Sequence, residues 1–492
     1  MAGISRRNIL RGGMLAATAL FTTRLAGTSA ARAAEAPLAV AYNELELTGD
    51  LRQFPSWWMG GYGWNPRGCA GPGDIARHLK AHCMVIHDNG VPNVLLRLDI
   101  ISIPRDVHQE IRRRVVDEEG LVAAEDFMIV TSHTHNGLFV GDTHPDPVLV
   151  LGVNDADVDA INGTTFVLMD MLVELVRRTV QETPIPATLW YDEGYEEIGF
   201  NRAGLDHVMT DVPVLLARNA DDGTPLAVLF GYACHPVARP RDEKIDSDYA
   251  GLAADLIADR LGIMALYFQG CAGDQNPAEG VTLADAGRKI ADTVVEVIER
   301  DQFTQVTGPF QNAMTEVELL FNRDLTDPDE VAALAERYEA RLAAPGTQEQ
   351  AKRHARLVLD QIENDTLPTS IPMPIQRWRL GGLTILGLSH EVLSTYHVLL
   401  KDVAADLGLG HLWIMAYVGE TQCYVGADDA LRAGGYEVGW ENGEDDIVKH
   451  DGASVSYGWP LPLRYSPDGV DPAAPDSAEG IVMKACTELL RP

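Results

Sequence analysis

Side chains able to bind a metal or transfer protons follow five apolar runs of the sequence. Each run has the length and composition of a β-strand. Open α/β sheets bind ligands beyond the carboxyl ends of their strands, so we expect these side chains to converge on one site. The runs and the residues that follow them are Phe127–Thr131 before His133 and His135, Leu226–Cys234 before His235, Leu383–Ser389 before Glu391, Leu412–Val418 before Tyr424, and Met264–Gln269 before Asp274.

The pair His133 and His135 is the most informative of these elements. On an extended strand residues i and i+2 point the same way, so both rings could bind one metal, or one could bind while the other transfers protons. Taken alone, this pair is typical of a protein surface, and a single His235 is typical of a hydrogen-bonded core residue. Together with Glu391 they form a nitrogen and oxygen donor set, which suits catalytic zinc with an open position for water.

The elements that would position these residues alternate between apolar runs and segments of helical spacing, which predicts an α/β fold. Predicted strands are Val94–Ile101, Phe127–Thr131, Leu226–Ala233, Met264–Phe268, Leu383–Leu388 and Leu412–Val418. Predicted helices are Ile103–Glu119, Thr165–Val180, Tyr249–Leu261, Ala284–Glu299 and Ala478–Leu490. Two charged helical segments around Pro345-Gly346 predict a helical hairpin over residues 328–364. One large domain over residues 34–492, with this hairpin inserted, fits better than several small domains.

The first 33 residues have the order of an export signal. Arg6-Arg7 lies in a twin-arginine pattern, a short apolar stretch follows, and Ala31-Arg32-Ala33 resembles a cleavage site. The sequence therefore predicts export by the twin-arginine pathway to the periplasm or the medium. A cytoplasmic leader is the alternative. The apolar stretch is too short and polar to span a bilayer.

Composition excludes some classes of partner. The 492 residues carry a net charge of −33, which disfavours binding to nucleic acid and to anionic lipid. The six cysteines include no C-x-x-C pair, so a thiolate zinc site is not indicated. Their even number permits disulfides in an exported protein, but the spacing identifies no pair. The oligomeric state is left open.

Several motifs, in order and spacing, resemble the catalytic domain of the neutral ceramidase family from about Leu38 to about Gly439. The resemblance implies a mixed β-sheet core flanked by helices. The motifs are Met59-Gly60-Gly61-Tyr62, Thr131-Ser132-His133-Thr134-His135-Asn136-Gly137, Phe200-Asn201-Arg202, Cys234-His235-Pro236, Ser247-Asp248-Tyr249-Ala250-Gly251, Ala272-Gly273-Asp274-Gln275-Asn276-Pro277, and the pair Tyr424 and Tyr436.

The resemblance also implies a role for each matching residue. The zinc ligands would be His133, His235, Glu391 and Tyr424. His135 would lie beside the scissile bond, and Arg202 and Tyr436 would steady the amide oxygen or the tetrahedral intermediate. The residues implied to support this site are Asp248, which would orient a ligand or anchor its loop, and Asp274 and Asn276.

The family resemblance implies hydrolysis of an N-acyl amide bond, in ceramide or a smaller amide, by water that zinc activates. Asn136 and Asn276 stand where the family has serines. Because an amide cannot act as a serine nucleophile, water is the better candidate. Trp57, Trp58 and Tyr62 are expected either to line an acyl pocket or to pack in the core.

Two alternatives remain open at this stage. A zinc esterase or lactonase could use the same groups, and an exported binding protein could have kept the fold without catalysis. The chain ends before the family's immunoglobulin-like domain could fit, so soluble or dispersed N-acyl amides are expected to be better substrates than ceramide in a bilayer.

Overall fold

The structure is a computed structural model that describes residues 38–48, 54–63, 67, 71–242, 244–439, 447–448, 452–467 and 469–491. The predicted twin-arginine signal, residues 1–33, lies outside the described residues. No helix in the described part of the chain is long and apolar enough to cross a membrane.

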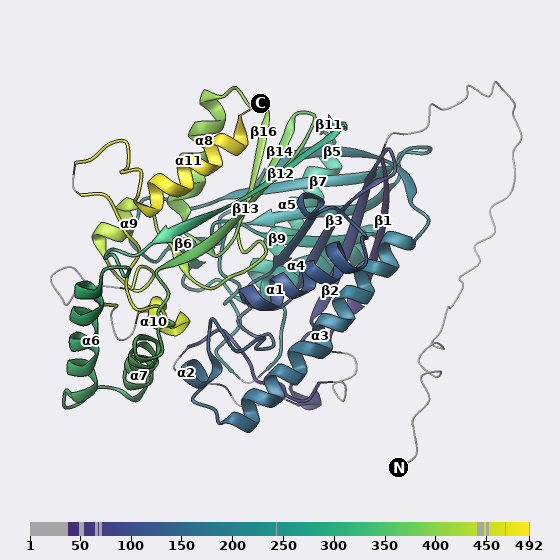
Figure 1. Ribbon diagram of the computed structural model, residues 1–492. Coiled ribbons are helices and arrows are strands. Elements are labelled where there is room, and N and C mark those ends of the chain that lie inside the picture. Colours follow the sequence, from purple (N-terminus) through teal and green to yellow (C-terminus); the bar gives the residue numbers. More distant parts are fainter. Residues whose placement is uncertain are drawn as a thin grey trace, which may run out of the picture. The chain divides into compact units, whose positions relative to one another are not determined.

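A nine-stranded mixed sheet forms the centre of the fold (Figure 1). Eight strands follow the order β4-β3-β2-β1-β5-β7-β8-β9, and β11 pairs with β5. The pairs β3–β4 and β8–β9 are parallel and the other neighbours are antiparallel. The strands are β1 (Leu38–Glu46), β2 (Lys80–Asp88), β3 (Val91–Leu98), β4 (Phe127–Thr131), β5 (Ile185–Tyr195), β7 (Asp211–Asn219), β8 (Pro225–Tyr232), β9 (Met264–Gln269) and β11 (Thr304–Val306).

A second sheet, β12-β13-β14-β16, packs on one face of the large sheet. Its strands are β12 (Phe310–Leu320), β13 (Ser370–Leu380), β14 (Leu383–Leu388) and β16 (His411–Met415). β14 and β16 run parallel, and the other neighbours are antiparallel. Two short pairs complete the strands, β6 (Gly199–Asn201) with β10 (Gln275–Pro277), and β15 (Glu391–Val392) with β17 (Tyr424–Val425).

Alternation along each strand explains how the layers stack. In β2, Cys83 and Val85 join the core beneath the helices, whereas Met84 and Ile86 join the core between the sheets. Successive side chains of a strand point to opposite faces, so one strand serves both cores. Helices therefore cover the free face of each sheet, and the order of layers is helix, sheet, sheet, helix.

The helices on the large sheet include α1, α3, α4 and α5, whereas α8 and α11 lie on the small sheet (Figure 1). Helices α6 and α7 form the helical hairpin that was predicted over residues 328–364. The helices are α1 (Arg105–Arg112), α2 (Pro147–Leu151), α3 (Asp155–Gln181), α4 (Asp248–Leu261), α5 (Leu283–Arg300), α6 (Pro328–Ala343), α7 (Glu349–Glu363), α8 (Ser394–Asp406), α9 (Asp428–Ala433), α10 (Ala453–Tyr457) and α11 (Ala478–Leu490).

The predicted α/β class, with a mixed sheet flanked by helices, is confirmed. The stacking of two sheets is an addition that periodicity did not indicate. The predicted strand Leu412–Val418 is too long, because β16 ends at Met415 and Tyr417 has a φ of 58°, outside the β region. The predicted helix Ile103–Glu119 begins at Arg105, and its last turns, Arg113–Glu118, form a π-helix.

Candidate metal centre and active site

The ends of several strands bring the predicted ligands together. His133 follows β4 by two residues and His235 follows β8 by three. Glu391 and Tyr424 begin β15 and β17, and they lie opposite each other in that parallel pair. The side chains of His133, His235 and Glu391 are buried, so the cluster lies at the base of the site.

Backbone carbonyls orient both imidazoles. His133 Nδ1 lies 2.8 Å from the carbonyl oxygen of Ile101, and His235 Nδ1 lies 2.6 Å from that of Ala272. Because a carbonyl oxygen only accepts hydrogen bonds, each Nδ1 carries the proton and donates it. A proton on Nδ1 leaves Nε2 as the nitrogen that can bind a metal, as in a metal-ligating histidine.

These two lone pairs face one carboxylate oxygen. Glu391 Oε2 lies 3.0 Å from His133 Nε2 and 3.2 Å from His235 Nε2. Burial lowers the pKa of His235 to about 4, so its Nε2 carries no proton at neutral pH. Two imidazole nitrogens and one carboxylate oxygen therefore converge on one buried point. Nitrogen and oxygen donors that converge in this way fit a metal ion.

His135 adds a third nitrogen to the cluster. Its Nε2 lies 3.2 Å from His133 Nε2, and the ligating nitrogens of His133, His135 and His235 all lie within 4.8 Å of one another. Burial, followed by the charges of the neighbouring histidines, holds the pKa of His135 well below its ordinary value. Its Nδ1 is buried and has no hydrogen-bond partner among the residues that the structure describes. His135 is thus a neutral ring that lines the cavity.

The strand argument that put His133 and His135 on one face is wrong in its geometry. β4 ends at Thr131, and His133 has a φ of 62°. Asp248, His390 and Tyr417 also have positive φ, which costs roughly 1–3 kcal/mol at each such non-glycine residue. Backbone bonds hold these turns, including Thr131 N to the Tyr417 carbonyl. The rings of His133 and His135 meet because the chain turns sharply after the strand.

Tyr457 is a neighbour of Glu391 that sequence reasoning missed. Its hydroxyl donates to Glu391 Oε1 at 2.5 Å, leaving Oε2 for the histidines. Burial raises the pKa of Tyr457 well above its ordinary value, so the hydroxyl keeps its proton. Burial alone would raise the pKa of Glu391, but His133 and His235 outweigh it, and that pKa stays well below its ordinary value. No motif in the sequence pointed to Tyr457.

Arg202 links Tyr424 to the loop after β9. Its Nη2 lies 3.2 Å from the Tyr424 hydroxyl and donates to the Gly273 carbonyl at 2.8 Å. Its Nη1 donates to Asn276 Oδ1 at 2.9 Å, and its Nε donates to Glu437 Oε1 at 2.8 Å. Bonds on all three nitrogens give the guanidinium a fixed orientation beside the tyrosine.

Tyr436 lies over the same guanidinium at the mouth of the site. Its ring centroid is 5.6 Å from Arg202 Cζ and 6.1 Å from the centre of the Tyr424 ring. The residue is 47% exposed, so its side chain can meet a bound molecule.

The two predicted supporting aspartates have structural contacts. The Asp248 carboxylate accepts from the backbone nitrogens of Ala238, Arg239 and Tyr249, so it anchors the loop after His235. Burial raises its pKa to about 6.

Asp274 joins three segments and makes no recorded bond to the histidines. It accepts from Asn201 Nδ2 at 2.7 Å, and from the backbone nitrogen and hydroxyl of Ser394 at 2.9 and 2.6 Å. Ser394 begins α8, three residues after Glu391. Asp274 therefore helps to set the position of Glu391.

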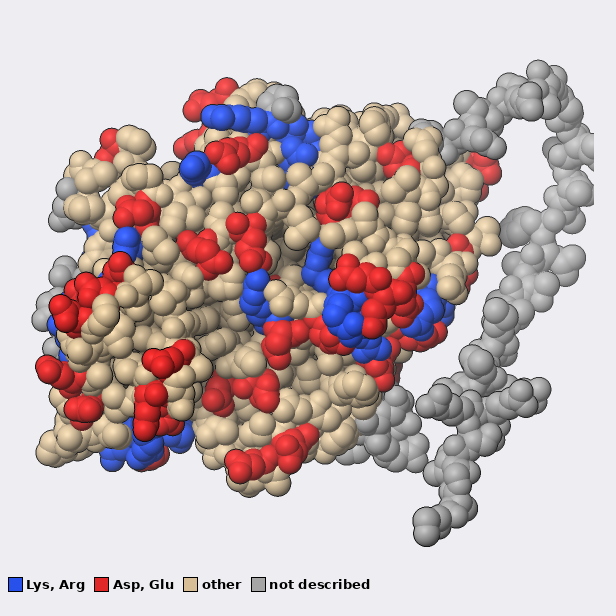
Figure 2. All heavy atoms as spheres, viewed as in Figure 1, with Lys and Arg blue, Asp and Glu red and all other residues tan. Residues whose placement is uncertain are grey.

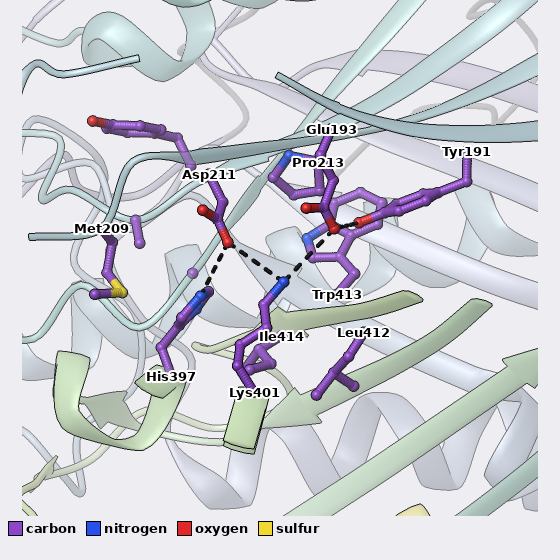
Figure 3. A pocket seen from close by; sticks show the side chains of 13 residues that line it. Tyr191, Glu193, Met209, Asp211, Pro213, His397, Lys401, Leu412, Trp413 and Ile414 are labelled. Carbon is purple, nitrogen blue, oxygen red and sulfur yellow. Dashed lines mark hydrogen bonds and ion pairs between the residues drawn. The ribbon is translucent and has the colours of Figure 1, made fainter. Parts of the chain in front are cut away.

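A series of polar contacts joins α8 to strands β5 and β7 of the large sheet (Figure 3). His397 Nε2 lies 3.2 Å from Asp211 Oδ2, and Lys401 Nζ lies 3.4 Å from the same oxygen. Lys401 also lies 3.6 Å from Glu193 Oε1, which accepts from the Tyr191 hydroxyl at 2.7 Å. We call Tyr191, Glu193, Asp211, His397 and Lys401 the α8 anchor.

Two cavities adjoin the histidines. The wider one, about 790 Å³, is lined mainly by polar residues, among them His135, Arg202, Asn276 and Tyr436. The narrower one, about 60 Å³, shares His135, Tyr424 and Tyr436. Its apolar lining residues are Ile101, Phe139, Val140, Pro145, Val150 and Ala453. The site therefore offers a polar and an apolar compartment that share His135, Tyr424 and Tyr436.

The aromatic residues near the glycine-rich segment separate into two roles. Trp57 is buried in the core beneath the helices, and Trp58 packs against a smaller core cluster. Tyr62 lines the wider cavity. The five cysteines in the described ranges, Cys83, Cys234, Cys271, Cys423 and Cys486, are buried free thiols.

Comparison with solved structures supports the same fold. The neutral ceramidase from Pseudomonas aeruginosa is similar with a TM-score of 0.65 at 17% sequence identity, over 92% of this chain and 74% of that chain. A ceramidase complexed with C2 gives a TM-score of 0.64 at 17% identity, over 93% and 74%. No protein-family model and no curated protein sequence matches the chain. The chain therefore has the fold of neutral ceramidase, as its motifs predicted.

Proposed function

We propose that this protein is a zinc-dependent amidohydrolase that cleaves an N-acyl amide. The observation that carries the proposal is the convergence of His133 Nε2 and His235 Nε2 on Glu391 Oε2, at 3.0 and 3.2 Å, beside two cavities. The likeness in fold to ceramidases makes amide hydrolysis the favoured reaction.

His133, His235, Glu391 and Tyr424 would hold the metal. Two imidazoles and a carboxylate form a donor set found in catalytic zinc sites, with room for water. When bound, zinc supplies Lewis acidity that polarises a carbonyl and acidifies water. Tyr457 keeps Glu391 oriented through its hydrogen bond to Oε1.

His135 is the proposed proton carrier. It is neutral at neutral pH because burial lowers its pKa, and it faces the wider cavity. It would accept a proton from the attacking water and deliver it to the leaving nitrogen. Arg202 and Tyr436 would stabilise the negative charge that develops on the amide oxygen.

Water is the proposed nucleophile. The serine of the family motif is replaced by Asn276, whose Oδ1 is bound to Arg202 Nη1 at 2.9 Å. The Cys271 thiol is fully buried, and burial raises its pKa, so it is a poor nucleophile. Asn276→Ala should therefore lower activity modestly by loosening Arg202, and mass spectrometry should detect no acyl-enzyme. A trapped acyl group on any side chain would contradict this.

Metal analysis combined with a matched substrate panel tests the function. Purified protein should contain about one zinc per chain, given a single four-ligand site. Chelation should abolish turnover of N-acyl amides, and added zinc should restore it. Esters and lactones with the same acyl chain should be poorer substrates. Full amidase activity without metal, or turnover restricted to esters, would refute the proposal.

Export by the twin-arginine pathway is part of the proposal and rests on residues 1–33. Replacing Arg6 and Arg7 with lysine should leave the precursor in the cytoplasm. Fractionation and the N-terminal sequence of the mature protein would test this. An unprocessed wild-type protein in the cytoplasm would exclude it.

A further inference from the structure

The wider cavity carries positive charge in a strongly acidic protein. The chain has a net charge of −33, and acidic side chains are spread over the face shown in Figure 2. The charged side chains that line the cavity, apart from His135, are Arg202, Arg241 and Glu437. The remaining polar lining includes the amides of Asn276, Gln348 and Gln350. The cavity is thus more favourable to an anion than the surface around it.

Arg241 has no acidic partner among the described residues, although carboxylates lie close to it. Glu437 is bound by Arg202 Nε at 2.8 Å. Asp242 is bound by both Arg239 Nε and Arg239 Nη2, at 3.1 and 3.0 Å. Arg241 itself is exposed, and its recorded contact is with the face of Tyr62. Its guanidinium is therefore available to a ligand.

Tyr62 connects Arg241 to the reacting centre. Arg241 Cζ lies 4.3 Å from the Tyr62 ring centroid, and that centroid lies 5.1 Å from the ring of His135. Arg67 Cζ lies 4.7 Å from the Tyr62 centroid and donates to the carbonyl oxygens of Gly60 and His135. Tyr62 is held in place, and the Arg241 cation lies one aromatic ring away from His135.

We propose that the substrate is an N-acyl amino acid, whose carboxylate binds Arg241. This inference rests on the proposed amidohydrolase function. The first carbons of the acyl chain would enter the narrow apolar cavity, and the amino-acid part would lie in the wider one. Water adds its oxygen to the acyl carbon, the carbon–nitrogen bond breaks, and the nitrogen gains a proton. The products are a carboxylic acid and a free amino acid.

The proposal depends on where the negative charge of the substrate would lie relative to Arg241. In an N-acyl α-amino acid the carboxyl carbon lies two bonds from the amide nitrogen, so the anion would lie in the cavity that Arg241 lines. A neutral amide would leave this cation without a role. Arginine binds carboxylates through two parallel N–H groups, and its contact with Tyr62 limits its motion. The surrounding acidic surface would repel an anion, so a local cation in the cavity is needed to retain it.

A matched pair of substrates tests the inference. N-dodecanoylglycine and N-dodecanoylethanolamine share the acyl chain and amide and differ in the terminal carboxylate or hydroxyl. The wild-type enzyme should prefer the glycine amide. In Arg241→Ala the ratio of kcat/KM for glycine amide over ethanolamide should fall about tenfold, the value expected for one charge-assisted hydrogen bond. Arg241→Glu should reverse the preference.

Arg288→Ala, at an exposed arginine on α5, is the control and should keep the wild-type ratio. Calorimetry gives a readout without turnover. N-(dodecylsulfonyl)glycine, which resists hydrolysis, should bind Arg241→Ala more weakly than wild type, and raised salt should narrow the difference.

The outcomes separate this inference from the proposed function. If the enzyme cleaves both amides with equal kcat/KM and Arg241→Ala leaves their ratio unchanged, the amidase stands and the carboxylate site is wrong. If the enzyme cleaves neither amide while an ester of the same acyl chain is cleaved, the proposed amidase function itself fails.

Discussion

Two clusters of histidine and carboxylate groups in this protein differ in how their protons are arranged. At the candidate metal centre, His133 and His235 direct their Nδ1 protons to backbone carbonyls and turn their Nε2 atoms toward Glu391. In the α8 anchor, the Lys401 ammonium lies between the carboxylates of Asp211 and Glu193 (Figure 3). The first cluster directs three donor atoms at one point, whereas the second contains its own cation.

Burial sharpens the difference. Glu391 is 2% exposed, whereas the Asp211 side chain is 38% exposed. A buried set of acceptors without a cation is costly, and a partly exposed set of ion pairs is inexpensive and only modestly stabilising. The comparison teaches that a metal site is identified by where its histidines direct their Nδ1 protons. At the metal centre these protons go to backbone carbonyls, and the Nε2 atoms are left to face a ligand. Residue types alone would have selected both clusters.

The largest expected effect is at the metal centre. His235→Ala should lose its stoichiometric zinc and reduce amide turnover to background, because one of the two proposed imidazole ligands is removed. Asp211→Asn, in the α8 anchor, should retain zinc. Elemental analysis of both purified variants, with circular dichroism to establish folding, checks this. A folded His235→Ala protein with full zinc content would remove the distinction between the clusters.

Acid should release the metal only well below the usual range for histidine. Burial lowers the pKa of the proposed ligand His235 to about 4. A lowered histidine pKa means that the neutral ligand form persists as the pH falls. Zinc should therefore remain bound at pH 6 and be lost as the pH approaches 4. Dialysis across this range followed by elemental analysis measures it. Half of the zinc lost by pH 6.5 would be the contrary result.

Two tyrosines offer a matched test of the supporting contacts. Tyr457 donates to Glu391 Oε1 and Tyr191 donates to Glu193 Oε1. Tyr457→Phe should weaken zinc binding by roughly 10–100-fold, as expected when a group that orients a ligand is removed. Tyr191→Phe should leave zinc affinity unchanged. Competition with a chelating dye measures the zinc affinity of each variant. Equal zinc affinities in Tyr457→Phe and Tyr191→Phe would show that the Tyr457 hydrogen bond does not orient Glu391 for zinc.

The smallest effect is on stability at the α8 anchor. A hydrogen bond from His397 is the main cause that lowers the pKa of Asp211 to about 2. Because the pKa of Asp211 is lower in the folded protein, its ionised carboxylate stabilises the fold at pH values above the pKa of the unfolded chain. This stabilisation is lost as the pH falls through about 2. Asp211→Asn should lower the free energy of unfolding by about 1 kcal/mol at pH 5, allowing for partial exposure.

The difference should shrink as the pH falls toward 2. Urea unfolding at pH 5 and at pH 2.5 measures it, with Asp259→Asn on the exposed side of α4 as the control. A constant difference at both pH values would show that the ionised carboxylate is not what stabilises this contact.

The amino-acid sequence alone determined the local elements and the residue types of the site. Apolar runs such as Phe127–Thr131 and Leu383–Leu388 are strands with the predicted bounds, because buried strands are continuously apolar. The hairpin over residues 328–364 followed from its charged helical spacing and its Pro-Gly turn. Histidine, glutamate and tyrosine after these runs indicated a metal site before any contact was known.

Tertiary structure alone decided how those residues meet. The direction of the His133 ring depends on a φ of 62° and on the Ile101 carbonyl, which lies in another segment. Tyr457 reaches Glu391 across 66 residues of sequence, and Arg241 reaches His135 only through the ring of Tyr62. Such contacts depend on packing between distant segments, and a pattern read along one chain contains no record of them.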